Sequence, residues 1–251
     1  KTAQLLWEHE NYIKKHYFKL QNGKKYKITR TNPYRFVNDY YFNLISNWAD
    51  DTLYLYFVPL VHGVLDTPDY LESLLQNKKI PAIKMHGFGS GFSIKDIRGE
   101  LIEVLKYYDV PLILHTSVYN YNYGYGVDTK YFRNECHPLL WANFLVKHRL
   151  KGVLNHGACL NQEAVDLVNK YDNLMIGIGP DLDLSIDYFK ADIDKMNLDQ
   201  IGYLKLLKRM VDSHKLLFDL DYGWNIDPKT GNYDTLQLKR MNDVWNSNDM
   251  V

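Results

Sequence analysis

Hydrophobic positions along the chain fall into two alternating patterns. Short runs of consecutive apolar residues are typical of strands that are buried on both faces, as in parallel sheets. Between these runs, apolar residues recur three or four positions apart, which is the spacing of amphipathic helices. The runs predict strands within 23–31, 52–60, 80–92, 110–117, 150–157, 173–180 and 215–224. The helical spacing predicts helices over 1–20, 32–51, 67–78, 93–109, 137–149, 161–172, 184–213 and 232–245.

This order of elements predicts an α/β fold. Strands that alternate with helices form a parallel sheet, because each helix carries the chain back to the start of the next strand. Seven strands are expected, one fewer than a (β/α)8 TIM-type barrel requires. We therefore expect a single, N-terminally incomplete barrel domain over residues 1–251, with its first strand upstream of Lys1.

Composition narrows the classes of partner and compartment. Thirty basic and thirty acidic side chains cancel, so no net charge attracts the chain to nucleic acid or anionic membranes. This chain shows no apolar stretch of transmembrane length and no secretory signal. The glycine-rich stretch 87–91 lacks the dinucleotide-binding spacing, and there is no Walker sequence. Cys136 and Cys159 form no spacing motif, which is consistent with a reducing compartment. We expect a cytoplasmic protein.

Polar side chains follow the apolar runs at the carboxyl ends of four expected strands. Lys84 and His86 follow the first of these, His115 and His156 the next two, and Asp221 the last. α/β barrels collect functional groups at this end of the sheet, and imidazole and carboxylate are ordinary zinc ligands. Because side chains alternate along a strand, Lys84 and His86 are expected on one face, directed into the barrel mouth.

Each of these residues also has a structural interpretation. A histidine that ends an apolar run can be a core residue bonded to a backbone carbonyl, and Lys84 can neutralise a carboxylate. His62 lies in a loop setting and is a weaker candidate, whereas His137 precedes a proline and is expected to help begin a helix. Of Asp219 and Asp221, only one is expected to face inward.

Four segments together resemble the amidohydrolase superfamily. They are AIKMHGFGSGF (82–92), VPLILHTS (110–117), GVLNHGACLNQEAVDLVNKYDNLMIGIG (152–179) and LLFDLDYGW (216–224). The chain is similar to the amidohydrolase-related branch that includes aminocarboxymuconate semialdehyde decarboxylase, over about residues 53–224. The resemblance implies a (β/α)8 barrel with one or two metal ions, commonly zinc.

The resemblance also implies roles for the matching residues. His115 corresponds to a metal-binding histidine. His156 corresponds to a histidine that binds a second metal or acts as an acid, base or electrostatic anchor. Asp221 corresponds to an aspartate that contacts the metal and shuttles a proton. We assign substrate binding to three further residues: Lys84, His86 and Trp224.

One expected feature of the family is missing from the matched region. Its first strand carries a His-x-His pair that binds the metal, and the chain shows no such pair. The pair lies upstream of Lys1, or His9 and Asn11 form a degenerate copy of it, or it has been lost. Upstream placement is favoured, since a copy at His9 leaves too little chain for the usual helix and strand.

These observations favour a metal-dependent hydrolase that acts on an amide, ester or lactone of a small molecule. Zinc is the expected metal, with manganese and iron as alternatives. The tyrosine-rich stretch 117–126 is interpreted as a specificity loop or as an ordinary surface loop. Two other functions stay open: a metal-dependent decarboxylase of an aromatic or unsaturated acid, and a non-catalytic barrel without first-strand ligands. We expect a small-molecule substrate, and no nucleic-acid or membrane partner; homo-oligomerisation is left open.

Overall fold

A computed structural model describes six stretches of the chain together with the backbone of two short strands. The six stretches are 31–47, 56–76, 80–90, 92–116, 136–178 and 200–218. The strands are β1 (Phe18–Lys19), β2 (Lys25–Tyr26), β3 (Ile83–Met85), β4 (Leu112–Leu114), β5 (Gly152–Leu154), β6 (Leu174–Ile178) and β7 (Leu216–Phe218). The helices are α2 (Arg35–Ser46), α3 (Pro68–Leu75), α4 (Gly87–Ser90), α5 (Gly99–Tyr108), α6 (Pro138–His148), α7 (Gln162–Lys170) and α10 (Gln200–Met210). Three short 3-10 segments, η1 (Ile94–Asp96), η3 (His156–Leu160) and η4 (Ser213–Lys215), complete the described elements.

The central feature is a parallel sheet whose strands follow their order in the sequence. Strands β3 to β7 pair in the order β3-β4-β5-β6-β7, and every pair is parallel. Leu60 forms a parallel bridge to Lys84, which places the segment before β3 along its outer edge. β1 and β2 form a separate antiparallel pair. The predicted α/β architecture with a parallel sheet is therefore confirmed for this part of the chain.

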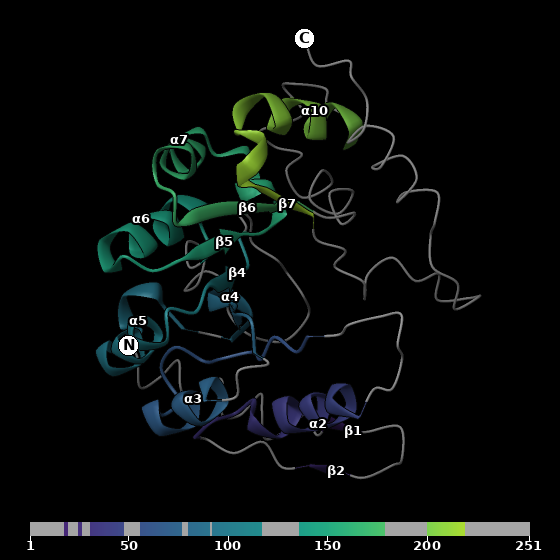
Figure 1. Ribbon diagram of the computed structural model, residues 1–251, viewed down its shortest axis with the longest axis vertical. Coiled ribbons are helices and arrows are strands. Elements are labelled where there is room, and N and C mark those ends of the chain that lie inside the picture. The colour runs from purple at the N-terminus through teal and green to yellow at the C-terminus, as the bar shows by residue number, and fades with distance from the viewer. Residues whose placement is uncertain are drawn as a thin grey trace, which may run out of the picture.

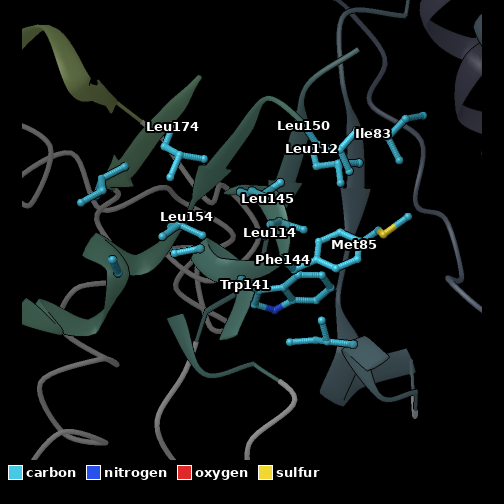
Figure 2. Packing of buried hydrophobic residues seen from close by; sticks show 14 of the residues in the cluster. Ile83, Met85, Leu112, Leu114, Trp141, Phe144, Leu145, Leu150, Leu154 and Leu174 are labelled. Atoms are coloured by element: carbon cyan, nitrogen blue, oxygen red, sulfur yellow. The ribbon is translucent and has the colours of Figure 1, made fainter. Parts of the chain in front are cut away.

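Helices cover one face of this sheet (Figure 1): α5, α6 and α7 lie on the same side of β4, β5 and β6. Gly152 faces this layer, because a Cβ at that position would overlap the Leu145 side chain of α6. Residues in register with Gly152, or two positions further along, share its face and form the core. Figure 2 shows these strand residues beside Trp141, Phe144 and Leu145 of α6: Ile83, Met85, Leu112, Leu114, Leu154 and Leu174.

The opposite face of the sheet carries the alternate side chains of each strand. Lys84 pairs in register with Ile113, which pairs with Val153 on β5. A Cβ on Gly177 of β6 would lie 2.6 Å from the Asn155 Oδ1 atom, so Asn155 also projects on this side. By the same alternation, residues two positions beyond Lys84 and Ile113 face away from the helices. They are His86 and His115.

Several helices begin at the capping residues that the sequence indicates. Thr67 accepts a hydrogen bond from the Tyr70 N–H at the start of α3. His137 is the N-cap of α6, and its Nδ1 atom accepts from the Leu139 N–H. Asn161 caps α7 in the same way. Each cap satisfies a backbone N–H that the first helical turn leaves without a partner.

Two of the expected helices begin elsewhere than predicted, for reasons that their hydrogen bonds show. Asn32 was expected to open the helix of 32–51, but Tyr34 is the N-cap of α2, and the Asn32 side chain instead accepts from the Thr67 N–H at 2.8 Å. The expected helix 93–109 is divided into η1 and α5, because the Arg98 N–H donates to the Gly63 carbonyl rather than to the preceding turn.

The helix predicted over 1–20 is wrong at its end, because Phe18–Lys19 form strand β1. The rest of that helix, the helix over 232–245 and residues 52–55 of the predicted strand lie outside the residues that the structure describes. Residues 56–60 of that strand are described, and they pair with β3 through the bridge at Leu60 alone. Within the described residues, none of the helices combines the length and the apolar character that crossing a membrane requires.

Candidate metal site

Three histidines converge where neighbouring strands end. His86 follows β3, His115 follows β4 and His156 follows β5. The imidazole rings of His86 and His115 are stacked, with centroids 3.8 Å apart and planes 11° from parallel. His156 approaches His115 edge-on, and its Nε2 atom lies 2.8 Å from His115 Nδ1. These three expected site residues therefore form one cluster.

The backbone of η3 explains how His156 reaches this cluster. Asn155 is in register with His115, so regular alternation would turn His156 toward the helix layer. At His156 the backbone enters the left-handed region, with φ of 56°, and it remains there through Leu160. Left-handed geometry costs roughly 1–2 kcal/mol for each residue with a Cβ. The surrounding contacts must offset this strain. The left-handed backbone in turn directs the imidazole of His156 to His115.

Thr116 contributes some of those contacts. Its hydroxyl donates a hydrogen bond to the Asn155 carbonyl, directly before the left-handed segment. The Cys159 thiol, inside that segment, donates in turn to Thr116 Oγ1 at 3.7 Å. Thr116 is 1% exposed, so these bonds form in a dry environment where they are stronger than in water. Thr116 directly follows His115, so these bonds connect the end of β4 to the turn that carries His156.

Cys136 completes the cluster, although the sequence does not mark it as a site residue. Its Sγ atom lies 3.8 Å from His86 Nδ1. One donor atom each from His86, His115 and Cys136 fall within 4.8 Å of one another. The cysteine is 3% exposed and precedes His137, the N-cap of α6. The sequence gives one indication of this role, which is that Cys136 directly precedes a helix that packs against the same strands. Its spacing from the histidines along the chain does not reveal the contact.

Burial keeps the two stacked imidazoles neutral. Burial, followed by the positive charge of Lys84 and the nearby His156, lowers the pKa of His86 to about 3. Burial also lowers the pKa of His115 well below its usual value, and His86, His156 and Lys84 add to the effect. Neutral imidazole is the form that binds metals. At physiological pH both rings therefore have a ring nitrogen lone pair to offer.

The donor atoms fit a divalent metal in type, and the pair from Cys136 and His86 also fits in spacing. Zinc–nitrogen and zinc–sulfur bonds of about 2.0–2.3 Å place tetrahedral ligand atoms about 3.3–3.8 Å apart. The contact between Cys136 Sγ and His86 Nδ1, at 3.8 Å, agrees with this separation. The His156–His115 contact of 2.8 Å is too short for two ligands of one metal and has the length of a hydrogen bond.

The ring planes fit less well than the donor atoms. A metal lies in the plane of each imidazole that binds it, and the nearly parallel planes of His86 and His115 do not meet near the site. One ring must therefore turn about its Cβ–Cγ bond when a metal binds. His156 holds the ring of His115 through Nδ1, so we expect His86 to turn and His115 to bind through Nε2.

The remaining predicted site residues are distributed differently. Lys84 lies on the same face as His86, and its charge acts on both His86 and His115. Asp221 and Trp224, expected as a proton shuttle and a substrate contact, lie outside the described residues, as do His9 and the tyrosine-rich stretch. The roles assigned to all of these residues remain predictions.

His62, the weaker candidate, belongs to a second buried group. Its Nδ1 atom accepts from the backbone N–H groups of Val64 and Leu65, at 3.2 and 3.1 Å. Its own backbone N–H donates to Asp66 Oδ2 at 2.8 Å. Both side chains are fully buried, and burial raises the pKa of Asp66 to about 7. These bonds shape the turn between Leu60 and α3, which is a structural role.

A cavity of about 370 Å³ lies at the opposite ends of the strands. It is bordered by residues that end α5 and α6 and precede β4 and β5, including Lys106, Asp109, Lys147, Arg149 and Lys151. Basic side chains are favoured at helix carboxyl ends, where the backbone carbonyls are negative. Lys151 also pairs with Asp109. The charge of this cavity thus follows from helix termination, and the cavity does not include the histidine cluster.

In comparisons with known proteins, no protein-family model matches this chain, and neither a curated protein nor a solved structure matches it. The geometry of the histidine cluster therefore carries the functional conclusion.

Proposed function

We propose that this protein is a metal-dependent hydrolase of the amidohydrolase type, built on a (β/α)8 barrel. The observation that carries the proposal is the convergence of His86, His115 and His156 at the carboxyl ends of three adjacent parallel strands. In barrel enzymes this edge of the sheet holds the catalytic groups. The sequential strand order supports a barrel, since doubly wound sheets reverse their order at a switch point.

In this proposal, His86 and His115 hold a divalent metal, most simply zinc. When bound, such a metal supplies water activated for attack at neutral pH. Hydrolysis adds that water across an acyl C–N or C–O bond, with the hydroxyl on the carbonyl carbon and the proton on the leaving atom. His156 orients His115 by a hydrogen bond, as partners of metal-binding histidines commonly do.

Lys84 gives the site a positive charge on the sheet face that carries His86. An ammonium in this place attracts a carboxylate of the substrate, or the negative charge that develops on its carbonyl oxygen. Asp221, at the expected end of the last strand, is assigned to proton transfer. The substrate class is therefore a small amide, ester or lactone, with an anionic group favoured.

The test combines metal content with hydrolysis. The purified protein is analysed for bound zinc, manganese and iron, and is assayed against a panel of chromogenic esters, amides and lactones. We expect about one equivalent of metal and hydrolysis of at least one substrate, with both lost in His115→Ala. His214→Ala, at an exposed histidine of η4, is the matched control and retains both. A folded protein that binds no metal on addition of zinc contradicts the proposal.

A further inference from the structure

We propose that Cys136 is a third metal ligand, so that the site takes a thiophilic divalent metal, zinc above all, in preference to magnesium or manganese. This inference rests on the proposed metal function of the histidine cluster, and it adds a ligand that the sequence resemblance does not supply.

The position of the thiol carries the inference. Cys136 Sγ is 3.8 Å from His86 Nδ1 before that ring turns, which is close to the separation of two ligands on one zinc ion. The three donor atoms of Cys136, His86 and His115 lie within 4.8 Å of one another. They come from separate parts of the chain: the ends of β3 and β4, and the residue before the N-cap of α6. Their common location is thus a product of the fold and is not a local sequence effect.

The chemistry of the donors decides the class of metal. A thiolate and two imidazoles are soft to borderline ligands, which favour zinc and the later transition metals. Magnesium and manganese favour carboxylate, carbonyl and water oxygens. Metal binding removes the proton of the Cys136 thiol to solvent, and one metal–sulfur bond replaces the S–H bond. Cys136 directly precedes the N-cap of α6, and the positive end of a helix favours a nearby negative charge.

The chain supplies a matched control. Cys159 is the second of its two cysteines and is also buried. Its thiol donates to Thr116 Oγ1 at 3.7 Å, and the cysteine is not part of the three-residue donor group. A variant at Cys159 therefore tests whether any effect is specific to the sulfur beside His86.

Cobalt(II) replaces zinc as a spectroscopic probe in the experiment. The full chain is stripped of metal with a chelator and titrated with cobalt under argon. We expect visible d–d bands together with an intense near-ultraviolet band from charge transfer between thiolate and cobalt. Cys136→Ser should lose the near-ultraviolet band and bind cobalt more than about 100-fold more weakly, since loss of a hydrogen-bonding partner alone costs 10–100-fold. Cys159→Ser should keep the band.

The outcomes separate this inference from the proposed function. Visible bands without charge transfer in the wild type leave the metal site standing and overturn the role of Cys136. Absence of any cobalt or zinc binding overturns both proposals. If Cys136→Ser fails to fold by circular dichroism, Cys159→Ser decides: a retained band can come only from Cys136, and a lost band contradicts the inference. Displacement of cobalt by manganese as readily as by zinc also contradicts it.

Discussion

His156 Nε2 lies 2.8 Å from His115 Nδ1, and this single contact connects the ends of two neighbouring strands. If His115 binds metal through Nε2, its proton is on Nδ1 and is donated to His156. The contact then fixes both the tautomer and the orientation of His115. It makes His156 a positioning residue.

The first prediction follows from this contact. His156→Ala should weaken zinc binding by about 10–100-fold, the usual effect of removing a partner that orients a metal-binding histidine. His115→Ala should weaken it considerably more, because a ligand is lost. Competition with a chromogenic zinc chelator measures both affinities. Equal losses in the two variants would show that His156 is itself a ligand, which is one of the two roles that the sequence resemblance implies for it.

The second prediction concerns Thr116. Thr116→Val keeps the shape of the side chain but removes the hydroxyl that bonds to the Asn155 carbonyl and the Cys159 thiol. We expect a loss of roughly 1 kcal/mol in the free energy of unfolding. Zinc affinity should also fall, since the left-handed turn that carries His156 becomes less well held. Urea unfolding and zinc titration measure the two effects.

Thr116→Ser is the control for this variant. It retains the hydroxyl and should restore zinc affinity, although it removes a buried methyl group. A Thr116→Ser variant with the same metal affinity as Thr116→Val would show that packing by the methyl group, and not the hydrogen bond, holds the turn.

The third prediction uses two glycines that differ in their surroundings. A Cβ on Gly177 would lie 2.6 Å from Asn155 Oδ1 and 3.3 Å from Val153 Cγ1, whereas a Cβ on Gly99 meets nothing within 4 Å. Gly177→Ala should therefore destabilise the fold by about 1–3 kcal/mol. Gly99→Ala, in the first turn of α5, should stabilise it by about 0.4–1 kcal/mol. Thermal unfolding measures both, and a neutral Gly177→Ala would contradict the close packing of Asn155.

The fourth prediction concerns pH and Asp66. Burial raises the pKa of this carboxyl from 3.8 to about 7, so the folded protein binds its proton more tightly than the unfolded chain does. The contribution of Asp66 to the free energy of unfolding is then fully present below about pH 4. It declines above that pH and is lost as pH rises through about 7. The shift corresponds to on the order of 4 kcal/mol across this window.

Asp66→Asn should remove this part of the pH dependence, because an amide does not ionise. Its oxygen can still accept from the His62 N–H, as Asp66 Oδ2 does at 2.8 Å. Asp69→Asn, at an exposed position in the first turn of α3, is the control and should keep the wild-type slope. Urea unfolding at a series of pH values from about 4 to about 8 measures how the free energy of unfolding of each protein changes with pH. Parallel slopes in wild type and Asp66→Asn would contradict the raised pKa.

The sequence predicts those features of the fold that depend on neighbouring residues. The apolar run before His115 is a buried strand, and Thr67 and His137 begin helices as expected. A cap or a strand requires only a few consecutive residues, so its signal is complete in a short window. The convergence of His86, His115 and His156 was also expected, since parallel strands end at a common edge.

Features that depend on contacts between distant parts of the chain could not be predicted from short windows of sequence. Cys136 meets His86 across 50 positions of sequence, and no spacing motif marks that distance. The left-handed backbone from His156 to Leu160 is unexpected, since of these residues only Gly157 adopts it readily. Likewise, the raised pKa of Asp66 reflects burial by distant elements, and its local sequence resembles that of any turn aspartate.

The sequential order of the parallel strands has a consequence for how the protein is made. Each strand of the sheet pairs with the strand that precedes it in the chain, so a nascent polypeptide emerging from the ribosome finds its next partner already exposed. The sheet can then lengthen by one strand and one helix at a time, with loops of modest length closed at each step. The proposed metal ligands emerge in the same order, His86 first, then His115, then Cys136, which returns to the side of His86.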